Sequence, residues 1–149
     1  MRFPVHIDPW WRPLLLAGGA TTGNSYVELT EDHVLFHFGL LFRRSVPRGD
    51  VESARIRPWP FWYGVGWRTN FVGLVGLIGS YRGVVEVQLR KPVRAWGLLP
   101  CRRITVSLQN PDAFVAVLRE SPAAQAPAPR ARRPRASRRP RRTSGHTKE

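Results

Sequence analysis

The sequence predicts a mainly β protein: one small domain over residues 1–120 that ends in a helix, followed by a disordered tail over residues 121–149. Apolar and polar residues alternate with period two through much of the first part, which is typical of strands with one buried face. An Asn-Pro pair at 110–111 begins a stretch with helical spacing. Bulky apolar residues are absent after Ser121, so the remainder cannot build a core.

Length and charge limit the class of protein. The chain has 149 residues, which suits one domain, and a formal net charge of +14 at pH 7. The domain holds fifteen basic residues against nine carboxylates, and the tail holds nine against one. This excess favours a polyanionic partner: an anionic membrane surface, nucleic acid or an acidic protein. The alternative is a genomic composition bias, because 22 of the 24 basic residues are arginine.

Residues 1–24 are expected to form a lead-in to the β domain. Apolar residues alternate up to Ile7, as in a short strand. Asp8 and Pro9 then have the N-cap and N1 arrangement of a helix start, and a glycine pair at 18–19 ends this short helix.

About seven strands are expected to follow. Their segments are 25–30, 34–38, 41–46, 51–57, 85–90 and 104–108, with one or two more around 66–68 and 71–77. Glycine, proline and acidic residues predict turns at 31–32, 39 and 47–50, a hairpin turn at 79–83 and a loop over 92–101. In the fourth strand, Ala54 and Ile56 are expected to point inward, and Arg55 and Arg57 outward.

The last element of the domain is expected to be a helix. Asn110 is its N-cap, Pro111 its first residue, and Asp112 favours the positive end of the helix dipole. Its apolar stripe consists of Phe114, Val117 and Leu118. Pro122 ends it.

The tail is expected to be disordered and to bind anions. Its anion-binding candidates are Arg130, Arg132, Arg133, Arg135, Arg138, Arg139, Arg141 and Arg142. Contacts of this kind neutralise phosphates without reading sequence and weaken with salt. The tail has no aromatic residue, so base stacking is excluded. The alternative is a solvated extension without a partner.

Short motifs in residues 1–120 resemble those of an uncharacterised family of small actinobacterial proteins. They are Phe3-Pro4, Arg12-Pro13-Leu14, Val27-Glu28, Phe38-Gly39, Val46-Pro47, Arg82-Gly83-Val84, Lys91-Pro92, Val106-Ser107 and Asn110-Pro111. The order of strands and closing helix also resembles a pleckstrin-homology-like (PH-like) domain. This resemblance implies a bent antiparallel sheet, or partly open barrel, of about seven strands capped by one helix. Bacterial domains of that kind are generally binding or assembly modules.

An aromatic segment between the strands is the main candidate for contact with a partner. Its residues and flanking arginines are Arg55, Arg57, Trp59, Phe61, Trp62, Tyr63, Trp67 and Arg68. Trp and Tyr favour the membrane–water boundary, and Arg favours anionic headgroups. The same residue types are frequent in protein–protein interfaces. The alternative is that these rings fill the interior of the domain.

Motifs for catalysis or metal binding are absent from the sequence, so we expect no enzyme, cofactor, metal or small-molecule substrate. His33 and His37 fall in a strand, where four steps separate them by about 13 Å, too far for one metal ion. Cys101, the only cysteine, excludes an internal disulfide and is expected to be a spectator thiol, although two adjacent arginines could lower its pKa. Arg48-Gly49-Asp50 is expected to be a hairpin turn rather than an adhesion motif.

The sequence therefore predicts a non-enzymatic binding module whose basic tail associates with an anionic surface, with membrane favoured slightly over nucleic acid. The alternative is a structural or assembly protein that uses the Trp59–Trp67 segment as a protein–protein interface. A single cysteine and the absence of an export signal favour the cytoplasm, with peripheral membrane attachment as an option.

Overall fold

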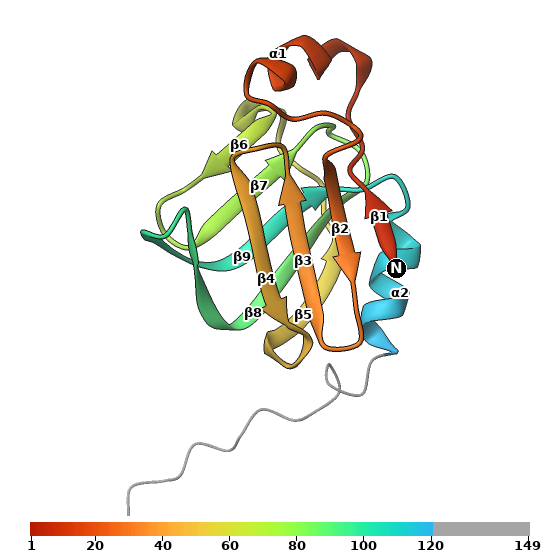
Figure 1. The fold of residues 1–149 in the computed structure, drawn as a ribbon, viewed down its shortest axis with the longest axis vertical. Helices are drawn as coiled ribbons and strands as arrows, with labels where there is room; N and C mark the ends of the chain where they lie inside the picture. The colour runs from red at the N-terminus through yellow and green to blue at the C-terminus, as the bar shows by residue number, and fades with distance from the viewer. Residues whose placement is uncertain (121–149) are drawn as a thin grey trace, which may run out of the picture.

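Two β-sheets face each other in the computed structural model, which describes residues 1–120 (Figure 1). The first sheet has the order β1 (Arg2–Pro4), β2 (Ser25–Leu29), β3 (His33–Phe38), β4 (Phe42–Pro47). The second has the order β5 (Val51–Ile56), β8 (Val84–Ala95), β9 (Leu99–Ser107), β7 (Leu74–Ile78), β6 (Gly66–Thr69). The mainly β class is confirmed, and within residues 1–120 the two sheets do not close into a barrel.

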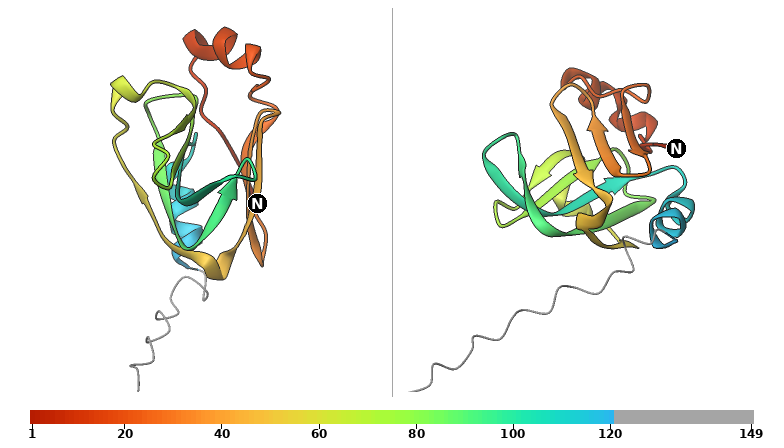
Figure 2. Two further views of the ribbon diagram at one scale, coloured as in Figure 1. Left: turned by 90° about the vertical axis from the view of Figure 1, so that its left-hand side faces the viewer. Right: turned by 60° about the horizontal axis from the view of Figure 1, so that its bottom comes forward.

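Helical segments lie at the ends and the open side of the two layers. Helix α1 (Arg12–Ala17) follows the 3₁₀ turn η1 (Pro9–Trp11), and both lie at one end of the molecule (Figures 1 and 2). Two more 3₁₀ turns, η2 (Arg48–Asp50) and η3 (Phe61–Tyr63), precede β5 and β6. Helix α2 (Pro111–Arg119) packs beside β5 and β8. None of the helices in the described residues has the length and hydropathy needed to cross a bilayer.

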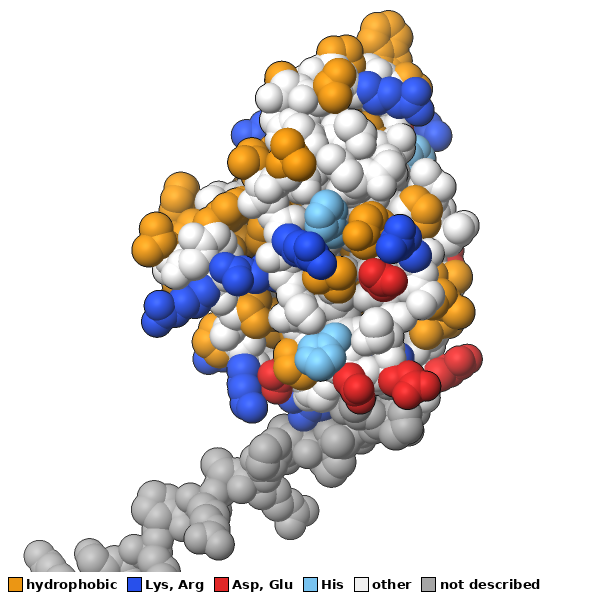
Figure 3. All heavy atoms as spheres, viewed as in Figure 1, with side chains coloured by type: hydrophobic (Ala, Val, Ile, Leu, Met, Phe, Trp, Pro, Cys, Tyr) orange, Lys and Arg blue, Asp and Glu red, His pale blue; other side chains and the backbone are white. Residues whose placement is uncertain are grey.

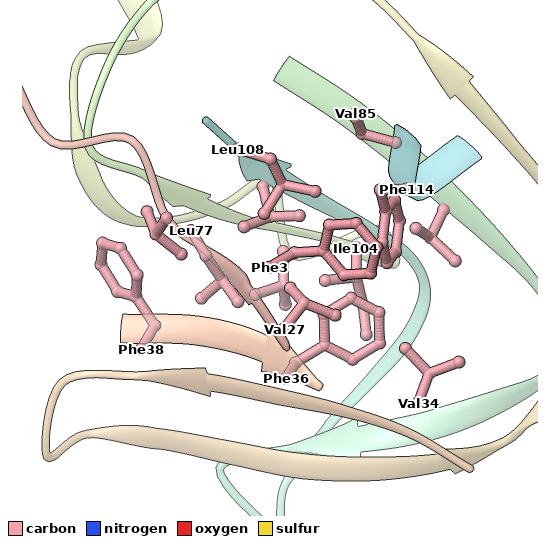
Figure 4. Close-up of a cluster of buried hydrophobic side chains, with 14 of the residues drawn as sticks. Phe3, Val27, Val34, Phe36, Phe38, Leu77, Val85, Ile104, Leu108 and Phe114 are labelled. Atoms are coloured by element: carbon pink, nitrogen blue, oxygen red, sulfur yellow. The ribbon is translucent and has the colours of Figure 1, made fainter. Parts of the chain in front are cut away.

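Alternating apolar residues of both sheets meet in one core. Figure 4 shows side chains from the two sheets and α2 converging there. Phe36 and Ile104, one from each sheet, are fully buried. Phe3 of β1 meets Phe114 of α2 edge to face, with ring centroids 5.2 Å apart. Burial of a large side chain of this kind stabilises the fold by about 1.5–3 kcal/mol, so the sheets and the helix depend on one another.

The N-terminal segment joins the two sheets. β1 pairs with β2 in the first sheet, and the next residues bridge to the second sheet at Val5–Leu108 and Ile7–Gly79. Residues 1–24 are therefore part of the core and not only a lead-in to it.

Helix α2 begins at Pro111, as predicted, but buries a slightly different face. Phe114, Val115 and Leu118 are buried, whereas Val117 is half-buried. The Asn110 side chain makes no capping hydrogen bond. Arg48 ties the helix to the sheets, because its guanidinium donates to the carbonyl oxygens of Val117 and Thr30 at 3.2 and 2.9 Å.

The turn predicted at 79–83 exists, but it does not connect a hairpin. β9 lies between β7 and β8 and runs parallel to β7. Gly83 takes φ +65°, and a Cβ there would lie 2.2 Å from the Leu108 carbonyl oxygen. The crossing of the chain at this point therefore requires glycine.

Two further expectations about the strands were wrong. The loop expected over 92–101 is a two-stranded arm, because β8 continues to Ala95 and β9 begins at Leu99. Ile56 was expected to point inward, but it is 47% exposed at the end of β5, an edge strand with a register shift between Val51 and Ser53. The turn at Arg48–Asp50 is confirmed as a 3₁₀ turn, but it does not connect a hairpin, because it leads from β4 of the first sheet to β5 of the second.

Candidate functional site

The aromatic segment divides into buried and exposed rings. Trp67 of β6 packs inward: its ring meets Phe38 edge to face at 5.2 Å, and its indole N–H donates to the Phe38 carbonyl oxygen at 3.3 Å. Phe61 and Trp62 of η3 point outward and are 74% and 73% exposed. The alternative that these rings fill the interior therefore applies to Trp67 but not to Phe61 and Trp62.

Trp59 is intermediate between these two groups. Its indole N–H donates to the Gly64 carbonyl oxygen at 2.9 Å, and its ring lies 5.4 Å from that of Tyr63. The ring covers the outer face of the second sheet over Gly76, where a Cβ would come within 2.9 Å of it. Trp59 also packs against a small buried cluster of Val65, Ile78 and Val84.

Tyr81 links the exposed rings of η3 to the α1 region. Its hydroxyl donates to the Phe61 carbonyl oxygen at 3.2 Å, and its ring meets that of Trp11 edge to face at 6.4 Å. On the other side of α1, a Cβ on Gly19 would meet the side chain of Leu40. The turn between β3 and β4, helix α1 and η3 therefore lie at the same end, as both ribbon views show (Figures 1 and 2).

This end carries a cluster of exposed apolar side chains, which we call the apolar end. Its residues are Trp10, Leu14, Leu16, Leu40, Phe61 and Trp62. Trp10 is 90% and Leu40 81% exposed. A cavity of about 350 Å³ beside α1 is lined by Ile7, Leu16 and Ala20, with Arg12 at its wall. Clustered apolar exposure of this kind makes this end the candidate interaction surface of the described residues.

Charge is distributed unevenly along the long axis. Arg12 in α1 and Arg82, which follows Tyr81, add cations near the apolar end. Glu31 and Asp32 lie in the turn before β3, opposite to the turn that follows it. In Figure 3 the acidic side chains visible on this face gather mostly at the end opposite α1.

The arginines of the predicted segment are found in two places. Arg55 and Arg57 lie near Glu86, with Nε atoms 3.9 and 3.7 Å from its Oε1. Arg68 instead turns toward the backbone and donates from Nε to the Val65 carbonyl oxygen at 3.0 Å. Arg55 and Arg57 therefore belong to the outer face of the second sheet and not to the apolar end.

The remaining predictions concern the Cys101 thiol, a metal site and the arginines of the tail. Cys101 is buried, and this burial raises the pKa of its thiol despite the nearby charge of Arg103. In residues 1–120, no three His, Cys, Asp or Glu side chains are placed to hold a metal ion. The eight tail arginines proposed to bind anions lie outside the described residues.

Sequence reasoning missed the contribution of α1 and the β3–β4 turn to the apolar end. It also missed Glu86, Arg103 and Thr105, which face outward next to Arg57. Alternation places each of the three on the outer face of its strand, but only the pairing of β8 with β9 brings them together. Comparison of the chain with family models, with curated proteins and with solved structures found no match to any of them.

Proposed function

We propose that the protein is a non-enzymatic module that binds an anionic membrane surface, with the apolar end entering the headgroup layer. The observation that supports it is the exposure of Trp10, Phe61 and Trp62 at one end of the molecule. Aromatic rings of this kind favour the membrane–water boundary. The cations Arg12 and Arg82 flank them, and a cation near an anionic surface contributes about 1 kcal/mol.

The orientation follows from the charge distribution. With the apolar end in the headgroups, Glu31 and Asp32 face away from the anionic surface. The cytoplasmic leaflet carries the anionic lipids, and a single cysteine suits the reducing side, so we place the protein there.

The basic tail is the second part of the proposal. Its nine basic residues against one carboxylate add cations beyond those of the domain. The tail contributes charge alone, because it has no bulky apolar residue, and the apolar end contributes apolar burial, so the two contributions are tested separately. Nucleic acid is the other target for the tail, and a parallel titration with duplex DNA distinguishes it.

The finer assignment of the fold also belongs to this proposal. The C-terminal helix packed beside a β-sheet supports a PH-like arrangement, as in the actinobacterial family whose motifs the sequence resembles. The parallel pairing of β7 with β9 and the four-plus-five division of strands depart from a single antiparallel sheet.

A vesicle-binding experiment tests the role of the apolar end. The full chain is titrated with vesicles of phosphatidylcholine alone and with added phosphatidylglycerol. We expect binding to the anionic vesicles, and about a tenfold loss of affinity in Trp62→Ser, because one large ring no longer enters the interface. Leu98→Ser is the matched control, since Leu98 is 84% exposed in the turn between β8 and β9. Equal losses in the two variants contradict the proposal.

Deletion of residues 121–149 tests the tail in the same assay. We expect weaker binding and a smaller dependence on salt, because screening acts on the charges and not on apolar burial. If the shortened chain binds vesicles and duplex DNA as the full chain does, the tail does not contribute to binding, and this part of the proposal is wrong.

An assembly role is the second candidate, because a different set of apolar residues is also exposed. Phe71 and Val72 lie in the turn between β6 and β7 and are 75% and 83% exposed. Leu98 is exposed in the turn of the β8–β9 arm. Oligomers that persist at high salt and are lost in Leu98→Ser support this role instead.

A further inference from the structure

A pocket lies on the outer face of the second sheet, and neither Phe61 nor Trp62 lines it. The segment from Arg57 to Tyr63 covers part of β8 and β9 and leaves a cavity of about 270 Å³. Its polar lining includes Arg57, Glu86, Arg103 and Thr105, and its aromatic lining consists of Trp59 and Tyr63. An apolar wall with a few converging polar groups is the usual form of a small-molecule site.

Strand pairing brings the polar groups together. Glu86 of β8 lies directly opposite Thr105 of β9 and, on its other side, opposite Arg55 of β5. Arg103 is two residues before Thr105, so its side chain leaves the same face of the sheet. The strands fix these groups, because the alternate residues of β8 and β9 are buried in the core.

The positive charge around the pocket exceeds the negative charge. Glu86 is only 6% exposed, and the Nε atoms of Arg55 and Arg57 stand at 3.9 and 3.7 Å from its Oε1, beyond hydrogen-bond distance. Arg103 forms no ion pair with a carboxylate of residues 1–120. Arg57 and Arg103 therefore line the pocket with one carboxylate, and Arg55 stands next to that carboxylate outside the pocket lining.

Thr105 gives an independent indication of a missing partner. The residue is 2% exposed, and its hydroxyl has no hydrogen-bond partner among the described residues. An unsatisfied buried polar group costs about 1–3 kcal/mol. A threonine that lines a cavity in this state has capacity for one more hydrogen bond.

We infer that this pocket binds a phosphate monoester. The group carries a charge of about −1.5 to −2 and offers three acceptor oxygens to Arg57, Arg103 and the Thr105 hydroxyl, whereas a carboxylate carries one charge and two oxygens. Guanidinium groups bind phosphate oxygens with two parallel hydrogen bonds, and here Arg57 and Arg103 supply them. Trp59 and Tyr63 then contact the organic part of the ester. This inference does not rest on the apolar end, because none of the residues of that end lines the pocket.

The experiment titrates the full chain with phenyl phosphate by isothermal calorimetry and compares it with benzoate, a carboxylate on the same ring. We expect phenyl phosphate to bind more tightly than benzoate. Arg103→Gln should weaken the binding of phenyl phosphate at least tenfold, because a charge-assisted hydrogen bond is lost. Thr105→Val, which keeps the shape of the side chain, should also weaken the binding of phenyl phosphate. Arg94→Gln, an exposed arginine on the β8–β9 arm, is the control and should have no effect.

Three results overturn the inference. They are no binding of phenyl phosphate at about 10 mM, equal binding of benzoate, or equal weakening by Arg94→Gln and Arg103→Gln.

A second experiment with vesicles distinguishes a lipid headgroup from a soluble ester as the natural ligand. Phosphatidic acid has a phosphomonoester headgroup and phosphatidylglycerol a diester. A preference for phosphatidic acid vesicles that Arg103→Gln abolishes identifies a lipid. Binding of phenyl phosphate without that preference identifies a soluble ester.

Discussion

Cys101 shows how local environment decides the chemistry of a residue. It lies in β9 with 1% of its surface exposed, and its thiol donates to the Arg103 carbonyl oxygen at 3.0 Å. Loss of hydration raises the pKa of the thiol, and the backbone hydrogen bonds and the charge of Arg103 offset only part of this effect. Adjacent arginines in a sequence therefore do not activate a thiol that the sheet removes from water.

This raised pKa predicts a specific pH dependence of stability. The folded chain keeps the Cys101 proton at pH values where the unfolded chain, with a thiol pKa near 9, loses it. The contribution of the thiol to the free energy of unfolding is therefore complete below that pH and falls as the pH rises through the higher folded value. Denaturant titrations at increasing pH should show the stability difference between wild type and Cys101→Ala shrinking above pH 9. A constant difference contradicts this.

Individual aromatic residues mark the limit of sequence reasoning at this scale. Trp59, Phe61, Trp62 and Trp67 lie within nine positions and share one composition signal. Their burial differs because Trp67 sits on a strand opposite Phe38, whereas the rings of η3 lie on a short turn that the core does not reach. Residue type predicts that such rings pack or bind, and the tertiary contact decides which.

At the scale of elements, strands with regular alternation were predicted well. β2 and β3 have their boundaries within one residue of the expectation, because each has one buried face and a polar turn between them. The β8–β9 arm was predicted as a loop because Pro92 and Pro100 are usual loop signals. Both prolines lie on the exposed part of the arm, where the protein tolerates a missing N–H donor.

The segment from Arg57 to Tyr63 depends on a glycine in the strand beneath it. A Cβ at position 76 would lie 2.9 Å from the Trp59 ring, so we expect Gly76→Ala to displace that ring and to lower stability by about 1–2 kcal/mol. The indole N–H resonance of Trp59, which the hydrogen bond to Gly64 holds, should shift and exchange faster with solvent.

Gly49→Ala is the matched control for this variant. Nothing lies within 4 Å of a Cβ at position 49, so the stability and the Trp59 signal should stay near those of the wild type. An unchanged Trp59 resonance in Gly76→Ala would mean that the ring does not rest on this strand.

At the scale of the whole molecule, a small polar cluster ties the N-terminal segment to the second sheet. Ser107 is fully buried; its hydroxyl donates to the His6 carbonyl oxygen at 2.9 Å and accepts from the Gly79 N–H at 2.9 Å. We expect Ser107→Ala to lower the free energy of unfolding by about 2–3 kcal/mol, because it leaves buried backbone groups unpaired. Denaturant unfolding monitored by circular dichroism measures this.

Ser45→Ala separates that effect from a general effect on strands. Ser45 is exposed on β4, so the substitution should change stability by less than about 0.5 kcal/mol. Equal losses in the two variants would show that the hydrogen bonds between Ser107 and the N-terminal segment contribute nothing of their own.

Long-range pairing was the part of the fold that the sequence did not reveal. The alternation around Val75 and Ile104 predicts two strands but not that they lie side by side and parallel. The alternation also does not predict that β1 and the residues that follow β1 connect both sheets. These contacts join positions far apart in the chain, so no local pattern reports them, and the pocket of Arg57, Glu86 and Thr105 depends on them.

The position of β9 has a consequence for biosynthesis. This strand occupies the centre of the second sheet, yet only α2 follows it among the described elements. While the chain is still emerging from the ribosome, β7 and β8 lack the neighbour that separates them, and Ser107 cannot yet reach His6. The second sheet therefore waits for nearly the whole domain to be translated, and a nascent chain that stops before β9 presents apolar strand edges to the cell's chaperones.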